Sequence, residues 1–377
     1  YLLAFLLATL AVYLTWCVKK WGTIAGMVCL AFAMGIYQAY ATVAIVLVLL
    51  YIIRQFVIEK LDFLEAVRKD LKYLGMLVGG AVLYAVILKI TLIRYNITLP
   101  GYQGIGALGI MSLGQYKAAL QKTLYHFRLI LGMEHGVEKH VYSLLNAAAL
   151  LLIGLILIYL LVRNQVYKKK MSMLASIAAV CLIPVGAYFI NFTSPDVQDY
   201  TLMEMAVCLI YLLMIIMLLQ LDWKTWISKI LKGCGIFVLC GLVYYNVINC
   251  NIAYFNMNLS YHKSISIAED VLQRIEQMDE FQNQHDKVVI MGDYNCATEN
   301  LQIMMPSIMG ISNDSFLNDS YHYTIIWNYC FGVQMEQASY DEMMEIVETD
   351  EYKNMSVYPL KGCVEYINGI IVVKMKE

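Results

Sequence analysis

Basic side chains gather around one apolar stretch and the helix expected to follow it. Lys89 and Arg94 lie at the end of the apolar stretch 73–93, and Lys122 and Arg128 follow on the predicted helix. Cations at headgroup depth can bind a lipid phosphate and stabilise the charge of a leaving phosphate. Long basic side chains also reach the membrane interface from helix ends without any ligand. Both interpretations stay open, and Lys89, Arg94 and Arg128 are the preferred candidates for binding a lipid phosphate.

A short polar and aromatic sequence interrupts the apolar stretch 22–51. Tyr37, Gln38 and Tyr40 lie near its midpoint, and polar groups inside a membrane must find partners or line a wet cavity. Aromatic rings at the membrane interface are an equally supported interpretation. The functional interpretation predicts that Tyr37 and Gln38 line a sugar site.

The densest group of histidine and carboxylate residues consists of His135, Glu138 and His140. His135 and Glu138 would share one helical face at a spacing of three, whereas His140 would point elsewhere. A metal site needs three or four converging ligands, so a solvated loop is the favoured interpretation and no metal site is predicted. Asp196 and Asp199 have a similarly weak claim to act as a general base.

The composition is that of a membrane protein. Hydrophobic residues make up 60% of the 377-residue chain, whereas soluble globular chains usually carry about 45–50%. Six stretches each approach or reach the roughly 20 apolar residues that cross a bilayer: residues 1–18, 73–93, 142–162, 171–192, 200–221 and 233–250. The formal net charge of -2 argues against a nucleic-acid partner, which would require concentrated basic surface.

The basic residues between the apolar stretches predict one topology. They cluster at residues 19–20, 54–72, 163–170 and 224–232, and such clusters mark the cytoplasmic ends of spans. Stretch 22–51 has a cluster at each end and would be about 45 Å long as one helix. Two short spans that meet at residues 35–40 would place both clusters on the same side of the membrane. Together with the six stretches above, they bring the predicted number of spans within residues 1–250 to about eight.

The segments between the remaining spans are predicted to lie outside. Within residues 95–141, Leu113, Leu120, Leu124, Phe127 and Leu131 recur at helical spacing, which predicts a helix on the outer membrane surface. Residues 251–377 predict a small extracytoplasmic α/β domain. It would contain helices at 263–278 and 339–349, a strand at 287–292, and a closing hairpin at 363–374 around an Asn-Gly turn.

Four stretches together resemble the bacterial membrane glucosyltransferases of the GtrII family, the O-antigen-modifying type. They are GIYQAY at 35–40, Tyr95 with GYQG at 101–104, residues 251–261 with Arg274 and Ile275, and residues 358–374 from Tyr-Pro to the terminal GIIVVK. The resemblance implies a GT-C-like polytopic helical bundle. It also implies that the catalytic base is an acidic residue upstream of Tyr1, so that the sequence is expected to be truncated at its N-terminus and its own catalytic residue is unknown.

The function implied by the resemblance is a glycosyltransferase of the bacterial cytoplasmic membrane. It would move a hexose, with glucose expected, from a polyprenyl-phosphate-linked donor to a cell-envelope polysaccharide at the outer face. Tyr37, Gln38, Tyr102 and Gln103 are the candidates for lining the sugar or acceptor site. No cofactor is predicted, and a divalent metal is compatible with this chemistry but has no support in the sequence.

Two alternatives come from other classes of protein. A transporter or flippase for a lipid-linked glycan would place its site near the bilayer midplane and often repeats broken helices in its two halves. The later half of this sequence has no second copy of the 35–40 turn. A membrane-anchored glycan-binding protein without catalysis is the other alternative. Loss of a sugar substituent on deletion of the gene separates the transferase from both.

Overall fold

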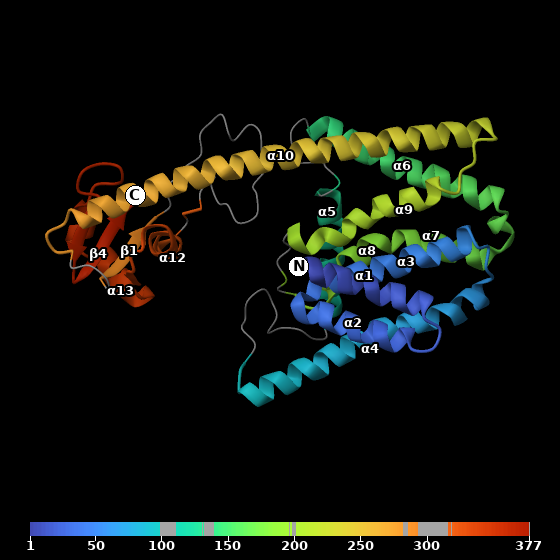
Figure 1. Ribbon diagram of the computed structural model, residues 1–377, viewed down its shortest axis with the longest axis horizontal. Helices are drawn as coiled ribbons and strands as arrows, with labels where there is room; N and C mark the ends of the chain where they lie inside the picture. The colour runs from blue at the N-terminus through green and yellow to red at the C-terminus, as the bar shows by residue number, and fades with distance from the viewer. Residues whose placement is uncertain are drawn as a thin grey trace. The chain divides into compact units, whose positions relative to one another are not determined.

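The computed structural model describes residues 1–98, 111–129, 131, 139–195, 197, 201–281, 286–292, 316–317 and 319–376. The chain divides into two compact units, Tyr1–Tyr245 and Asn246–Glu377, each of which is described by itself. The first unit is helical and the second contains a small β-sheet (Figure 1).

The helices of the first unit follow the apolar stretches of the sequence. Those described are α1 (Leu2–Cys17), α2 (Gly22–Ile36), η1 (Gln38–Tyr40), α3 (Ala41–Val57), α4 (Phe63–Tyr95), α5 (Leu113–Arg128), α6 (Lys139–Arg163), η4 (Val166–Lys168), α7 (Lys170–Cys181), α8 (Ile183–Ala187), η5 (Phe189–Phe192), η6 (Thr201–Cys208), α9 (Leu209–Leu218) and the beginning of α10 (Trp226–Glu276). Among the described residues, four helices are long and apolar enough to cross a membrane, and four shorter apolar helices accompany them. These helices support the prediction of a membrane helical bundle.

The predicted break in stretch 22–51 is confirmed. Helix α2 ends at Ile36, Tyr37 is extended at φ -160° and ψ 111°, and one 3₁₀ turn leads into α3. We call the end of the bundle that carries residues 37–40 the hinge end.

Hydrogen bonds and an ion pair join the segments of three of the four predicted basic clusters at the opposite end of the bundle, which we call the basic end. Lys169 Nζ donates to Lys60 O at 2.8 Å, and Asn164 Nδ2 donates to Val57 O at 2.7 Å. Arg163 forms an ion pair with Asp222 at 2.7 Å, which ties the turn before α10 to the end of α6. The connections after α3, α6 and α9 therefore lie together at the basic end.

Small residues let α1 and α2 approach closely. One face of α1 is fully buried and carries only small side chains: Ala4, Ala8, Ala11 and Thr15. Facing it, Gly26 of α2 leaves no room for a side chain, because a Cβ there would lie 2.5 Å from Thr15 Oγ1 and 2.7 Å from Ala11 O. Small residues serve membrane helix packing in this way because they allow dispersion contacts between backbones.

Replacement of Gly26 by Ala is expected to destabilise the bundle by about 1–3 kcal/mol, the usual cost of overpacking. The neighbouring atom at Ala11 is a backbone oxygen, so relief requires a shift of α1 against α2. Thermal unfolding of the purified protein in detergent measures the effect. Gly75→Ala is the matched control because a Cβ at Gly75 meets nothing within 4 Å. Equal unfolding temperatures for Gly26→Ala and the wild type would contradict this packing.

Two predicted spans are broken helices, so their prediction as continuous helices was wrong. Stretch 171–192 consists of α7, α8 and η5, and stretch 200–221 begins with the eight-residue 3₁₀ segment η6 before α9. The first break comes next to Pro184, whose ring removes a backbone donor and clashes with a preceding turn. Irregular backbone is tolerated at membrane depth where protein covers it, and Ala187, Tyr188 and Ala206 are buried.

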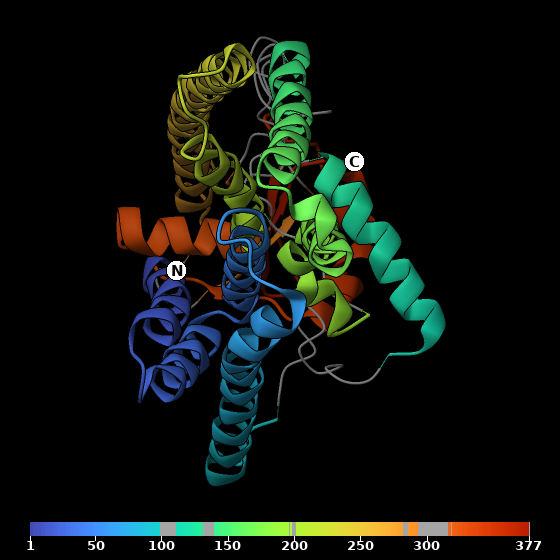
Figure 2. The ribbon, with the colours of Figure 1, turned by 90° about the vertical axis from the view of Figure 1, so that its right-hand side faces the viewer.

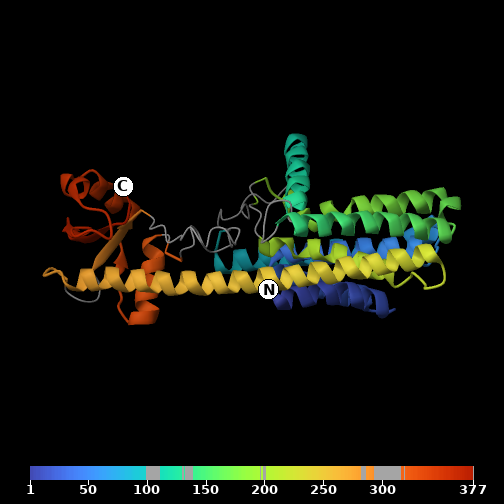
Figure 3. The same cartoon turned by 90° about the horizontal axis from the view of Figure 1, so that it is seen from above.

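Helix α5 runs across the long helices at the hinge end of the bundle (Figures 2 and 3). It begins with a capping box between Ser112 and Gln115. Its buried side carries Ala119 and Thr123. Within the predicted apolar stripe, Leu113, Leu120 and Leu124 are exposed, whereas Phe127 packs on the core of the bundle and Leu131 is only 4% exposed. A helix is therefore present where the sequence predicts one, and its position on the outer membrane surface stays a prediction.

The second unit contains a four-stranded mixed sheet of order β2-β1-β4-β3. Its strands are β1 (Lys287–Met291), β2 (Glu336–Gln337), β3 (Val364–Ile367) and β4 (Ile370–Lys374). Strand β1 pairs in parallel with β2 and β4, and β3 pairs with β4 antiparallel, with Ile367 opposite Ile370. The predicted hairpin is confirmed, and both turn residues, Asn368 and Gly369, have the positive φ that such a two-residue turn needs.

Helices cover both faces of the sheet. They are the end of α10, α12 (Ser320–Ile326) with the following π-helical turn η7 (Trp327–Phe331), α13 (Tyr340–Val347) and α14 (Asp350–Asn354). Strand residues alternate between faces, so Val288 and Ile290 pack with Ile275 and Trp327. Val289 and Met291 pack on the opposite face with Ile346 of α13. Helix α10 is continuous to Glu276, whereas the sequence predicts one helix ending at residue 250 and another beginning at 263.

Candidate functional site

Three chemically active side chains meet at the hinge end. Tyr188 donates a hydrogen bond to Glu204 Oε1 at 3.1 Å, and His126 Nδ1 lies 3.9 Å from the same oxygen. The rings of His126 and Tyr188 are 6.3 Å apart. Helix α5 supplies His126, the junction between α8 and η5 supplies Tyr188, and η6 supplies Glu204. We call these three residues the hinge-end cluster.

The hinge-end cluster is largely shielded from solvent. The side chain of Glu204 is 10% exposed and that of His126 is 26% exposed. A shielded carboxylate next to an imidazole can accept a proton from a hydroxyl group and stabilise the resulting charge. His126 Nδ1 is within ion-pair distance of the carboxylate but too far away for a hydrogen bond to it.

A lysine and two neutral polar residues adjoin the cluster. Lys122 lies one helical turn before His126 on α5, and its Nζ donates to the backbone oxygen of Val197. Asn191 Nδ2 donates to Thr123 Oγ1 at 3.5 Å, and both side chains are buried. These residues therefore lie close in sequence to His126 and Tyr188, and the bond between Asn191 and Thr123 joins η5 to α5.

The hinge lies against the segments that hold the cluster. Ala39, Val197 and Met203 form a buried apolar group, with Tyr37 and Ile190 packed on it. Met203 directly precedes Glu204, so residues 37–40 and the cluster share one neighbourhood.

The predicted sugar-lining residues of the hinge make internal contacts. The Tyr37 ring lies 5.1 Å from the ring of Tyr1 and 5.7 Å from that of Tyr40. Gln38 Nε2 donates to the hydroxyl of Tyr84 at 2.5 Å, which joins the hinge to α4. The structure brings Tyr37 close to the hinge-end cluster and turns Gln38 toward α4.

The predicted phosphate ligands are exposed. Lys89 and Arg94 lie on the last turns of α4, and Arg128 is the last residue of α5. Among the described residues, no hydrogen bond or ion pair joins these three side chains to one another. Their role in phosphate binding stays a prediction.

Several predicted residues lie outside the part of the chain that the structure describes. They are Tyr102, Gln103, His135, Glu138, Asp196 and Asp199, together with the side chain of His140. Within the described residues, no group of three or more His, Cys, Asp or Glu side chains is arranged to hold a metal ion.

Sequence reasoning missed the hinge-end cluster. Glu204 lies within the apolar stretch 200–221, and an acidic residue inside such a stretch is a signal for function in a membrane protein. His126 is 78 positions away and Tyr188 is 16, so no local pattern joins them. The acidic residue Glu204 inside an apolar stretch was therefore the one signal in the sequence that pointed to this site.

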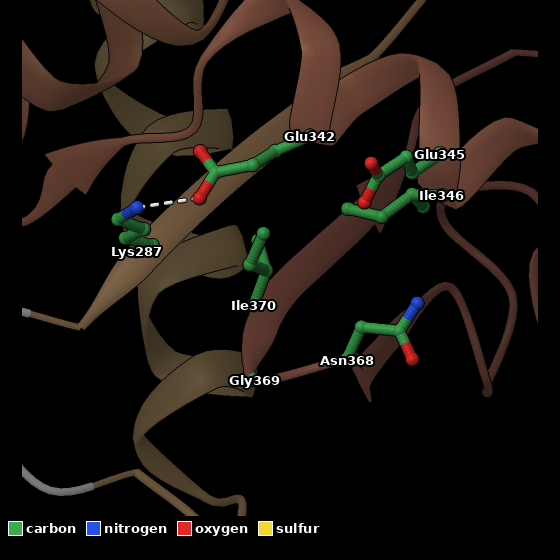
Figure 4. A pocket seen from close by; sticks show the side chains of 7 residues that line it. All are labelled: Lys287, Glu342, Glu345, Ile346, Asn368, Gly369 and Ile370. Atoms are coloured by element: carbon green, nitrogen blue, oxygen red, sulfur yellow. Dashed lines mark hydrogen bonds and ion pairs between the residues drawn. The ribbon is translucent and has the colours of Figure 1, made fainter.

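The second unit has a pocket of about 280 Å³ on the α13 side of its sheet (Figure 4). Lys287, Glu342, Glu345, Ile346, Asn368, Gly369 and Ile370 line it. Lys287 Nζ bonds to one oxygen of Glu342 at 2.5 Å, and the backbone and hydroxyl of Ser339 bond to the other at 2.7 and 2.9 Å. The Lys287 bond first, and then those from Ser339, lower the pKa of Glu342 from 4.5 to about 2.

Replacement of Glu342 by Gln is expected to lower the stability of the second unit at pH 7. A depressed carboxyl pKa contributes stability above the unfolded-state value, and this contribution disappears as the pH falls from about 4.5 to about 2. Unfolding temperatures of the two proteins should therefore differ at pH 7 and converge near pH 2. Glu348→Gln, an exposed site at the end of the same helix, is the matched control. A difference that persists unchanged at pH 2 would show that the ion pair is not its cause.

The fold and the site define a class of protein: a membrane helical bundle with an acid–base group at one end. The comparisons give the family. The model of the family described as Glucosyl transferase GtrII matches residues 1–194, slightly more than half of the 377 residues. The chain belongs to the GtrII glucosyltransferase family, and the protein is accordingly a glycosyltransferase. Comparison with curated proteins and with solved structures found no match.

Proposed function

We propose that this protein transfers glucose from a polyprenyl-phosphate-linked donor to a polysaccharide of the bacterial cell envelope, at the outer face of the cytoplasmic membrane. Family membership supports the transfer of a glucosyl group between a donor and an acceptor. The observation that carries the proposal is the meeting of Glu204, His126 and Tyr188 at the hinge end.

The reaction assigns a role to each group. An acceptor hydroxyl attacks the anomeric carbon of the donor, the bond from that carbon to the phosphate oxygen breaks, and the lipid phosphate leaves with the electron pair. Glu204 takes the hydroxyl proton, and His126 lies beside the carboxylate at 3.9 Å as a neighbouring polar group. Tyr188 orients the Glu204 carboxylate through its hydrogen bond. The acidic base upstream of Tyr1 that the family resemblance implies stays the alternative to this assignment.

Cations near the outer headgroups would stabilise the leaving phosphate. Lys122 adjoins the cluster through α5, and Arg128 is on the same helix. Lys89 and Arg94 would approach from the end of α4. Positive charge at this position counts most in the transition state, when the phosphate gains negative charge.

The orientation follows from the two ends of the bundle. The basic end would lie in the cytoplasm because Lys and Arg are retained there. The hinge end and α5 would then lie at the outer headgroups, with the exposed leucines of α5 in the lipid. Residues 246–377 would follow the crossing of α10 and lie outside. Tyr37, Gln38, Tyr102 and Gln103 remain the proposed lining of the sugar or acceptor site.

The broken helices favour one rival activity, movement of a lipid-linked glycan across the membrane. Interrupted spans such as α7–α8–η5 and η6–α9 occur at the binding sites of transporters. A flippase would leave the glycan structure of its cargo unchanged, whereas a transferase adds a sugar.

Comparison of envelope glycans from cells with and without the intact gene tests the proposal. We expect one glucose substituent to disappear on deletion and to return with the gene. The purified full-length protein should also transfer labelled glucose from polyprenyl-phosphate-glucose to the glycan of the deletion strain. Identical glycans in the two strains would overturn the proposal.

Replacement of Arg94 or Arg128 by Gln is expected to raise the KM for the lipid-linked donor roughly tenfold, since a hydrogen bond to a charged group contributes about 1.5–3 kcal/mol. Arg68→Gln, an exposed arginine at the other end of α4, is the matched control. Donor titrations at saturating acceptor measure the effect. An unchanged KM at both positions would remove these arginines as phosphate ligands.

A further inference from the structure

The pocket of the second unit has preorganised walls. It lies where the parallel strands β1 and β4 begin, beneath α13 and beside the Asn368–Gly369 turn (Figure 4). Three hydrogen bonds hold the Glu342 carboxylate, and the tight turn fixes the backbone of Asn368. Ile346 and Ile370 are buried in the core below and add an apolar wall. The Glu342 carboxylate and the turn are therefore held in place before any ligand binds.

The charge of the lining limits what can bind. Lys287 is neutralised by Glu342, which leaves the negative charge of Glu345 in excess. An anionic ligand such as a phosphate would meet this charge without a free cation opposite. A calcium ion takes six to eight oxygen ligands, and the described residues contain no cluster of acidic, histidine or cysteine side chains that would hold a metal.

A neutral polyhydroxylated ring, such as a sugar, fits the remaining groups that line the pocket. Carboxylate and amide oxygens of Glu345 and Asn368 can accept hydrogen bonds from neighbouring hydroxyls, and the amide nitrogen can donate one. Ile346 and Ile370 lie at the floor of the pocket but are only 1% and 5% exposed, so the polar groups would carry the recognition of the ring. The volume of about 280 Å³ lies at the lower limit of ligand pockets, roughly 300–1,000 Å³. It suits one ring rather than an oligosaccharide.

We propose that this pocket binds one neutral hexose unit of a glycan. The inference goes beyond the transfer reaction, since it assigns a sugar subsite to the second unit, separate from the residues proposed for catalysis. Only the identity of the glycan, an envelope polysaccharide, rests on the proposed function.

Methyl NMR of the full chain in detergent tests the subsite directly. With isoleucine methyl groups labelled, titration with D-glucose should shift the signals of Ile346 and Ile370, with a Kd in the millimolar range. Glu345→Gln and Asn368→Gly should each weaken binding at least fivefold. Glycine keeps the positive φ of position 368, so the turn persists when the amide is lost. Glu348→Gln, outside the pocket, should bind as the wild type does.

Three results would overturn the inference: no shift at Ile346 and Ile370, equal binding by both pocket variants and the wild type, or tighter binding of glucose 1-phosphate than of glucose. A chain that binds glucose in this pocket but transfers none would sustain the inference and overturn the proposed function. A chain that transfers glucose without shifts at Ile346 and Ile370 would overturn the inference and sustain the proposed function.

Discussion

Replacement of Glu204 by Gln is expected to lower kcat for glucosyl transfer about 10²- to 10⁴-fold, the usual contribution of general acid–base catalysis. Glutamine keeps the size of the side chain and an oxygen that can accept the hydrogen bond from Tyr188. It cannot take a proton from the acceptor. Transfer of labelled glucose from the lipid-linked donor, measured at saturating substrates, gives the rate.

Two further variants separate catalysis from packing around Glu204. Glu65→Gln, an exposed carboxylate at the basic end, should keep the wild-type rate. Tyr188→Phe should lose roughly tenfold, since it removes one hydrogen bond to a carboxylate but leaves the proton acceptor in place. The pH at which its rate is half-maximal should also shift, which a purely structural role would not cause. A correctly folded Glu204→Gln protein with wild-type kcat would remove Glu204 as the base.

Replacement of Trp327 by Ala is expected to destabilise the second unit by about 3–5 kcal/mol. Trp327 is fully buried, its ring lies 5.7 Å from that of Tyr323, and its Nε1 donates to Ala268 O at 2.8 Å. Alanine would leave a cavity between α10, α12 and the sheet and would take a partner from the carbonyl of Ala268. Urea unfolding followed at probes within residues 246–377 measures the loss.

Tyr329 provides the matched control for Trp327. It belongs to the same π-helical turn but is 83% exposed, so Tyr329→Ala should change the free energy of unfolding by no more than about 0.5 kcal/mol. A loss below 1 kcal/mol for Trp327→Ala would show that this ring does not hold α10 to the sheet.

Local patterns sufficed for several parts of the fold. Basic residues at both ends of stretch 22–51 predicted the break that the structure has at residues 37–40, because one crossing cannot return both ends to the same side. The Asn368–Gly369 pair predicted the hairpin because its φ values are accessible to few other residue pairs. In both places the decisive residues are neighbours in sequence.

The broken spans show where local patterns fail. Hydropathy records that stretch 200–221 is apolar but not whether its backbone is an α-helix or a 3₁₀ turn. Buried contacts with neighbouring helices decide between the two backbone conformations, because packing against those helices can stabilise an irregular segment. Pro184 was a visible signal for the other break, and the hydropathy of its neighbours outweighed it.

The sequence by itself determined that this protein is a membrane helical bundle, that its chain turns at residues 37–40 and 368–369, and the family to which it belongs. The tertiary structure alone decided that Glu204, Tyr188 and His126 meet. Hydropathy and turn propensity depend on neighbouring residues, whereas the hinge-end cluster depends on α5 crossing the ends of two broken helices. A carboxylate gains its chemistry from the groups that surround it in space, and those groups lie far apart along the chain.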